Sequence, residues 1–206
     1  MVHGLRQNLL RQSKFLLAVI LCVTLIHVSN AYGKAMLSHK SKTIFRGSTF
    51  TLKVNTKKKA KIKASNAKVS IKKSDAHSYK IKGLKAGTST IKVTVKKKSY
   101  TCKVKVNAYI NFSIVGYKGK KMMSKKIVYE KGDHAWDILK KSGASLKTKG
   151  FGFMLYVKSI NGLAEKQHGA TSGWMYSING KAPNVGCNAY KVKAYDREKW
   201  YYVTGH

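Results

Sequence analysis

Acidic residues are scarce in this chain, which has seven aspartates and glutamates against 42 lysines and arginines in 206 residues. The formal net charge is +35. Catalysis by paired carboxylates needs two acids whose pKa values are pushed apart. The chain offers few such pairs: Asp133 and Asp137 stand four residues apart, and Asp196 and Glu198 are expected in a turn. We therefore expect no enzyme and keep catalysis as the weakest alternative.

Arginine is nearly absent too, because only Arg46 and Arg197 occur beyond residue 31. Lysine is a hydrated point charge, whereas arginine supplies the planar fork that reads bases. The composition thus predicts loose attraction to a polyanion and no sequence-specific nucleic-acid binding. Candidate partners are an anionic cell-wall polymer such as teichoic acid, extracellular DNA or a glycosaminoglycan. The candidate polyanion-binding residues are Lys96, Lys97, Lys98, Lys120 and Lys121.

Cysteine is sparse, with Cys102 and Cys187 the two that lie beyond residue 31. Cys102 stands in an alternating run typical of a buried strand position, so we expect free thiols, and a disulfide is the alternative. A thiol–imidazole pair of Cys187 with His134 or His168 would be a nucleophile, but nothing in the spacing supports it. No histidines show metal-ligand spacing and no phosphate-binding glycine loop occurs, so we expect neither metal nor cofactor.

Long apolar runs are limited to Phe15–Val28, which follows a basic stretch containing Arg6, Arg11 and Lys14. This arrangement is typical of a secretory signal peptide. Small residues before position 32 predict cleavage after Ala31, so residues 1–31 are assigned as the signal peptide. A retained membrane anchor is the alternative. We expect a secreted or extracellular protein, held at the bacterial cell surface by charge or by a partner.

Alternation of apolar residues with lysine or threonine dominates the segment from Ser38 to Val106. The runs Thr51–Val54, Ile91–Val95 and Cys102–Val106 all repeat with period two. This is the pattern of half-buried strands. Short strands separated by turn residues at such spacing predict a β-sandwich. Lysines on the solvent face also hinder edge-to-edge pairing, so part of the charge has a structural explanation.

The same segment resembles the bacterial Ig-like domain family, group 2. The residues that carry the resemblance are Gly47 with Thr49–Leu52, Ile62–Asn66, and most specifically the block Lys82–Val93. Ile62 stands where the family often has tryptophan. The resemblance implies an Ig-like sandwich over residues 36–107, used as a spacer or in adhesion.

After a short linker at Asn107-Ala108 the pattern changes. Strands are predicted at Asn111–Tyr117 and Lys126–Tyr129, and a short helix starts with Asp133 as N-cap and ends near Gly143. Further strands are predicted at 151–157, 174–178, 190–192 and 200–203. Residues 108–206 are therefore predicted to form a small α+β, grasp-like domain with one short helix. The whole chain is predicted to be mostly β.

Aromatic residues crowd into this second half. Trp174, Tyr176 and Ile178 alternate with smaller residues, and Asn179-Gly180 then supplies a two-residue hairpin turn. A domain of this size cannot fully bury every aromatic side chain, so some are expected to line a surface or cleft. The candidate ligand-binding residues are Trp174, Tyr176, Tyr195, Trp200 and Tyr202.

The second half also resembles the transcobalamin-like C-terminal domain family. The matching segments are Ser172–Gly180, Lys131–Leu139, Val157–Gly162 and Trp200–Tyr202. Where the family has a Gly-Asp pair before the last strand, Ala194–Lys199 keeps the acid but not the glycine. The resemblance implies a binding module whose ligand is a cobalamin-like small molecule or a glycan. No segment of this sequence resembles the large helical domain that completes the cobalamin site in vitamin B12 carriers.

These observations together predict an exported, monomeric, non-catalytic binding or adhesion protein with its ligand site in the C-terminal domain. Lysine-driven polyanion binding is the second hypothesis. Cobalamin enters as a ligand through the resemblance alone.

Overall fold

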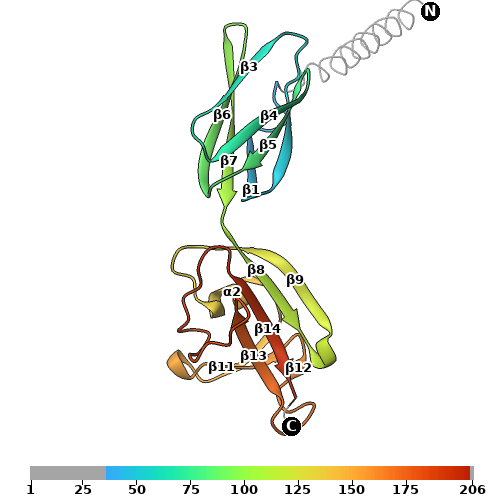
Figure 1. Ribbon diagram of the computed structural model, residues 1–206, viewed down its shortest axis with the longest axis vertical. Helices are drawn as coiled ribbons and strands as arrows, with labels where there is room; N and C mark the ends of the chain where they lie inside the picture. The colour runs from blue at the N-terminus through green and yellow to red at the C-terminus, as the bar shows by residue number, and fades with distance from the viewer. Residues whose placement is uncertain (1–35, 205–206) are drawn as a thin grey trace, which may run out of the picture.

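The computed structural model describes residues 36–204, which form two lobes joined end to end (Figure 1). Buried apolar side chains gather in two separate clusters, one within residues 36–107 and one within residues 108–204. We call these segments the N-terminal and C-terminal lobes. Only Ala108 separates the last strand of the first from the first strand of the second. The predicted signal peptide, residues 1–31, lies outside the described residues.

The N-terminal lobe is built from a four-stranded and a three-stranded sheet that share one core. The first sheet has the order β1-β7-β6-β3, and β1 pairs parallel with β7. The second has the order β2-β5-β4. The strands are β1 (Ser41–Phe45), β2 (Thr49–Lys53), β3 (Ala60–Ala64), β4 (Val69–Asp75), β5 (Ser78–Gly83), β6 (Gly87–Val95) and β7 (Lys98–Asn107).

Alternation along the strands explains why these sheets face each other. In β7, Cys102, Val104 and Val106 are buried, while Lys103 and Lys105 between them are exposed. Successive side chains of a strand point to opposite faces, so every strand of this kind offers one apolar and one polar face. Full burial of each aliphatic side chain stabilises the lobe by roughly 1.5–3 kcal/mol.

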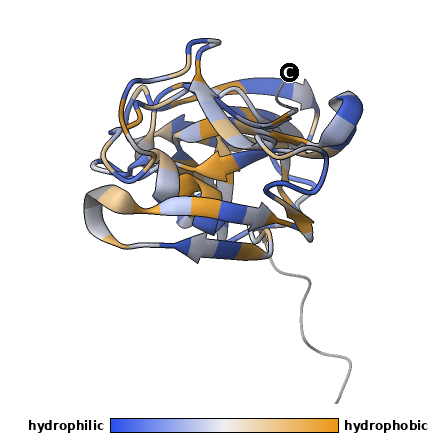
Figure 2. Cartoon of the chain, turned by 90° about the horizontal axis from the view of Figure 1, so that it is seen from below, coloured by the Kyte–Doolittle hydropathy of each residue, from blue (hydrophilic) through white to orange (hydrophobic). Residues whose placement is uncertain are grey.

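The C-terminal lobe centres on a mixed sheet of order β13-β14-β8-β9, in which β14 and β8 are parallel. A helix and a three-stranded sheet of order β10-β11-β12 complete the lobe. The elements are β8 (Tyr109–Val115), η1 (Tyr117–Gly119), β9 (Lys121–Val128), α2 (Ala135–Lys141), β10 (Leu146–Lys149), η2 (Gly152–Met154), β11 (Tyr156–Ile160), β12 (Leu163–Ala164), β13 (Gly173–Ile178) and β14 (Arg197–Val203). Figure 2, which looks along the long axis, shows hydrophobic segments toward the middle and hydrophilic ones in the outer loops.

The mostly-β class with a single short helix is confirmed for residues 36–204. Three local predictions need correction. The strand predicted at 151–157 is wrong over most of its length, because Gly152–Met154 forms the 3-10 helix η2 and β11 begins only at Tyr156. The N-cap of α2 is His134 and not Asp133, and the segment 190–192 forms no strand but only an isolated bridge between His134 and Lys191. Both φ angles of Asn179-Gly180 are positive, as a two-residue hairpin turn requires. In the described part of the chain no helix is both long and apolar enough to cross a membrane.

Aromatic contacts connect the lobes at their junction. The Phe45 ring of β1 meets Tyr109 of β8 edge-on, with centroids 5.5 Å apart. Tyr109 in turn meets Tyr195 at 5.4 Å, and the Arg46 guanidinium lies 4.6 Å from the Tyr195 ring centre. The short connection at Ala108 is thus reinforced by side chains from both lobes.

Candidate ligand-binding pocket

Four of the five predicted aromatic residues lie together on the inner face of the C-terminal sheet. Trp174 and Tyr176 of β13 stand opposite Tyr202 and Trp200 of β14. The rings of Tyr176 and Trp200 stack with centroids 5.4 Å apart, and Trp174 meets Tyr202 edge-on at the same distance. All four are at least nine-tenths buried, so they belong to the core of the lobe.

A pocket of about 200 Å³ opens over three of these rings. Its other walls come from the start of β11 and from the loop between β13 and β14. Its lining residues are Leu155, Tyr156, Val157, Trp174, Met175, Tyr176, Pro183, Val185, Gly186, Cys187 and Trp200. The predicted residues Trp174, Tyr176 and Trp200 are therefore brought to one hollow, where their use by a ligand stays a prediction.

The polar atoms of these three aromatic residues are already hydrogen-bonded within the protein. Trp174 Nε1 donates to the Leu163 carbonyl at 2.8 Å, and Tyr176 Oη donates to the Val185 carbonyl at 2.6 Å. Trp200 Nε1 donates to Glu198 Oε1 at 2.8 Å. These three residues thus offer ring surfaces and no free donors to the pocket. The Tyr176 bond also holds the Val185 loop against the pocket.

Exposed apolar side chains gather at this pocket. Of the six large apolar side chains that stay exposed among the described residues, only Leu84 belongs to the N-terminal lobe. Tyr156, Met175 and Val185 line the pocket itself. The other two, Phe151 and Met154, precede the wall residue Leu155 in the chain, and Asn188 on the opposite loop donates to the Gly152 carbonyl.

The two remaining predicted aromatics do not line the pocket. The hydroxyl of Tyr202 contacts the Ala164 carbonyl at 2.7 Å and Ser172 Oγ at 2.9 Å, so it braces the β12 segment. Tyr195 lies at the lobe junction with φ of 76°. This left-handed backbone occurs just before Asp196, where the resembling family has glycine. The tyrosine ring contacts Tyr109 and Arg46, which no glycine could do.

The prediction of a turn at Glu198 is wrong. The residue lies inside β14 and is fully buried, between Ile178 and Phe112 on the neighbouring strands. Its Oε2 atom has no hydrogen-bond partner among the described residues. Burial raises the pKa of Glu198 to about 8. The alternation Glu198, Trp200, Tyr202 on one strand face was the signal that could have revealed it.

Both cysteines are buried free thiols in different lobes. Burial, with the charge of Glu198 added, raises the pKa of Cys187 to about 11, so the thiol stays protonated at neutral pH. The His168 ring stacks on Tyr117 with centroids 3.7 Å apart. Within the described residues, neither His168 nor His134 is hydrogen-bonded to Cys187.

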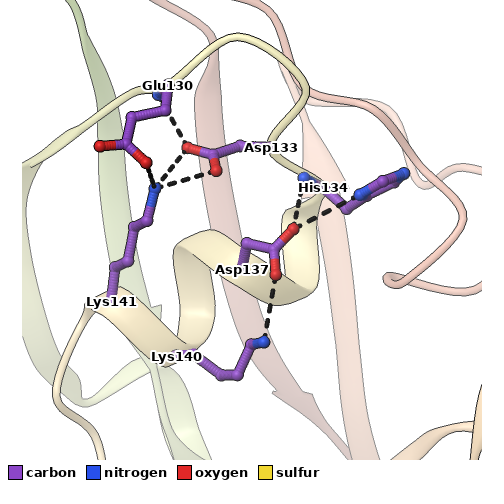
Figure 3. Close-up of polar contacts among 6 residues, drawn as sticks. All are labelled: Glu130, Asp133, His134, Asp137, Lys140 and Lys141. Carbon is purple, nitrogen blue, oxygen red and sulfur yellow. Dashed lines mark hydrogen bonds and ion pairs between the residues drawn. The ribbon is translucent and has the colours of Figure 1, made fainter.

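The acids near α2 form a network that secures the start of the helix (Figure 3). Lys141 Nζ donates to both oxygens of Asp133, at 2.9 and 2.8 Å, and to Glu130 at 3.2 Å. The amide of His134 donates to Asp137 Oδ2 at 2.9 Å, and Lys140 pairs with Asp137 Oδ1. Although burial opposes it, these bonds hold the pKa of Asp137 below its usual value. Asp133 and Asp137 thus have structural partners.

The structure does not bring the predicted polyanion-binding lysines together. Lys96, Lys97 and Lys98 lie at the turn between β6 and β7, at the end of the N-terminal lobe remote from the junction (Figure 1). They line a hollow of about 560 Å³ with Lys57 and Lys58 of another loop. The remaining two, at positions 120 and 121, are in the hairpin between β8 and β9 of the other lobe. Among residues 36–204 no group of three His, Cys, Asp or Glu side chains could hold a metal ion.

Part of the C-terminal lobe is similar to a known protein family. Residues 132–204 match a family described as a domain of unknown function, DUF4430. The Ig-like assignment of residues 36–107 stays a prediction. No curated protein matches the chain.

Solved structures share only a distant likeness with this chain. A candidate metal-binding protein from Ruminococcus gnavus ATCC 29149 aligns at 9% identity and TM-score 0.38, over 48% of this chain and 99% of that protein. Haptocorrin in complex with Cbi aligns at 13% identity and TM-score 0.37, over 50% and 27%. Domains 5–6 of the S-layer protein SbsC align at 13% identity and TM-score 0.29, over 79% and 94%. At these scores the similarities assign neither fold nor function.

Proposed function

We propose that this chain is an exported, non-catalytic binding protein of the bacterial cell surface whose C-terminal lobe holds an apolar or ring-shaped group of its ligand. The observation that carries the proposal is the concentration of exposed apolar side chains at one aromatic pocket. Contiguous exposed apolar surface on a soluble protein is typical of an interaction site. The N-terminal lobe, with Leu84 alone, has no comparable patch among its described residues.

The size of the pocket limits what it accepts. A volume of about 200 Å³ is below the range of roughly 300–1,000 Å³ typical of sites that enclose a whole small molecule. One sugar ring or one aromatic group suits this space, because the floor offers the faces and edges of Trp174, Tyr176 and Trp200. A cobalamin-like ligand would enter by one of its groups, and a glycan by one residue.

The state of the ionisable groups supports binding without catalysis. Asp133 and Asp137 are engaged in the network of α2. Cys187, the thiol at the pocket wall, has a raised pKa, whereas a catalytic thiol needs a lowered one. Export rests on the signal-like residues 1–31, and mature protein that begins near Tyr32 would support it. An intact N-terminus would instead favour the anchored form.

The pocket can be tested with rim variants that leave the core intact. Full-length protein would be screened against cobalamins, neutral glycans and aromatic small molecules in about 1 M salt, where the Debye length is about 3 Å and lysine attraction is screened. For any probe that binds, Val185→Ser and Met175→Ser should each weaken binding about five- to tenfold, because each removes apolar contact area. Leu84→Ser is the matched control and should have no effect.

Equal losses in all three variants would contradict the pocket as the site. So would a screen in which no probe of these classes binds at high salt.

A further inference from the structure

The outward face of the four-stranded N-terminal sheet has an unusual composition. Apart from the pair Phe45 and Asn107 at the junction end, every outward position on β3, β6, β7 and β1 is lysine, threonine or serine. Five of these positions are lysine: Lys61, Lys63, Lys92, Lys103 and Lys105. We call this surface the lysine–threonine face. It carries neither acid nor arginine, and its one aromatic residue, Phe45, packs against Tyr109 at the lobe junction.

Like charges stand directly opposite each other on this face. Lys63 of β3 is the cross-strand partner of Lys92 of β6. Directly opposed like charges destabilise a sheet. The lobe cannot compensate this repulsion, because Asp75 is its one acid and the five ion pairs among the described residues all lie between positions 130 and 165. The unbound lobe therefore carries electrostatic strain that an anionic partner would relieve.

Protection of sheet edges explains only part of this charge. Lysines on an edge strand discourage pairing with another chain, and β3 is an edge strand. Lys92 lies on β6 and Lys103 on β7, however, and both strands are central (Figure 1). Their ammonium groups protect no edge. Solubility would be served equally by a mixture of charges of both signs.

A hollow on this face combines charge with hydroxyl groups. It has a volume of about 400 Å³ and is lined by Lys63, Ala64, Ser65, Thr90, Lys92 and Thr101. The two opposed lysines thus flank hydroxyl-bearing side chains, and Lys103 is the cross-strand neighbour of Thr90. Ammonium and hydroxyl groups are donors that suit a tetrahedral anion such as phosphate.

From this arrangement we propose that the lysine–threonine face binds a linear polyol-phosphate polymer, with one of its phosphates in the hollow between Lys63 and Lys92. The chemistry of the face argues against nucleic acid, because bases are bound by stacking on aromatic rings or by bidentate arginine. Rows of lysine and hydroxyl side chains match a chain of phosphodiesters that has no bases. The site is independent of the aromatic pocket in the other lobe.

The test compares two full-length triple variants that lose the same charge from the same lobe. The face variant is Lys63→Thr, Lys92→Thr and Lys103→Thr. The control is Lys72→Thr, Lys80→Thr and Lys82→Thr on the outward face of the three-stranded sheet, where Lys72 and Lys80 are also direct partners. Threonine keeps strand propensity, and thermal unfolding should show both variants folded with melting temperatures no lower than that of the parent.

The probe is a synthetic poly(glycerol phosphate) oligomer, measured by titration at about 0.05 M and 0.2 M salt. The face variant should bind at least tenfold more weakly than the parent, and the control less than threefold more weakly. Log K decreases with log salt, and this negative slope should be shallower by about 2 in the face variant, because three phosphate contacts are lost. The oligomer should also raise the melting temperature of the parent, since it binds only the folded lobe.

Three results would overturn the proposal. Equal loss in both variants would show that only net charge matters, and no loss in the face variant would place binding elsewhere. Tighter binding of a single-stranded oligonucleotide with the same number of phosphates would contradict the base-free ligand. Binding of pocket ligands at high salt should not change in either variant, which separates this site from the one proposed above.

Discussion

The two lobes contain the same kind of alternating strand but use it differently. In residues 36–107 there are 21 lysines and arginines against one acid, and in residues 108–204 there are 17 against six. Three acids of the second lobe have structural roles: Glu198 is buried in the core, and Asp133 and Asp137 form hydrogen bonds that support α2. The first lobe therefore presents charge almost without pairing, whereas the second uses charge to hold its own elements.

The hydrophobic cores of the two lobes differ in their content of aromatic residues. Tyr79 is the one aromatic among the buried core residues of the N-terminal lobe, while the C-terminal core contains Phe112 and the four aromatic residues of β13 and β14. The hollows of the N-terminal lobe are lined mainly by lysine and hydroxyl-bearing side chains, whereas the pocket of the C-terminal lobe is lined mainly by aromatic and aliphatic side chains. In the two proposals above, the N-terminal lobe attracts its ligand by charge and the C-terminal lobe selects its ligand by shape.

The largest expected effect tests whether the lobes are independent. Trp200→Ala should destabilise the C-terminal lobe by about 3–5 kcal/mol, because Trp200 is only 2% exposed and stacks on Tyr176. Leu52→Ala, at a fully buried N-terminal position, should cost about 2–5 kcal/mol in the other lobe. Calorimetry should show two transitions, each lowered by one variant only. A single transition whose melting temperature is lowered by both variants would show that the lobes do not unfold independently.

The next prediction concerns Glu198, the buried acid of the C-terminal lobe, and the dependence of stability on pH. Because the pKa of Glu198 is about 8 in the folded lobe and 4.5 is its ordinary value, the folded state binds more protons than the unfolded state between these pH values. Stability of the C-terminal lobe should therefore fall as pH rises, by about 3 kcal/mol between pH 5 and pH 7. Denaturant unfolding at several pH values measures this slope.

Glu198→Gln is the control, because it keeps the shape but cannot ionise. Its C-terminal transition should be nearly flat over the same pH range. A parent slope that survives in Glu198→Gln would assign the pH dependence to another group.

The smallest effect concerns the paired acids. Lys141→Ala should destabilise the C-terminal lobe by about 1–2 kcal/mol, because it leaves the largely buried Asp133 without its cation. Lys140→Ala, which removes a half-exposed partner of Asp137, should cost no more than about 0.5 kcal/mol. Chemical denaturation separates the two. Equal losses of stability in the two variants would contradict the prediction, because they would mean that the burial of Asp133 does not strengthen its pairing with Lys141.

Prediction from sequence succeeded where a local pattern decides local structure. The alternating runs 91–95, 102–106 and 174–178 lie within β6, β7 and β13. The pair Asn179-Gly180 has the expected positive φ angles. Prediction failed at 190–192, which looked like a strand but finds no neighbouring strand for pairing beyond the bridge of Lys191 to His134. A β-strand forms only where a neighbouring strand accepts its hydrogen bonds, and the sequence of the segment alone does not show whether such a neighbour exists.

Composition and period-two alternation are local properties, so the mostly-β class, the excess of lysine and the concentration of aromatic residues in the second half could all be predicted from the amino-acid sequence. Tertiary structure decided the rest. Only cross-strand register placed Lys63 opposite Lys92 and Tyr176 opposite Trp200. Only the packing of the loops that contain Leu155 and Val185 turned aromatic core residues into pocket walls. Both outcomes depend on contacts between residues far apart in the chain, which no local pattern encodes.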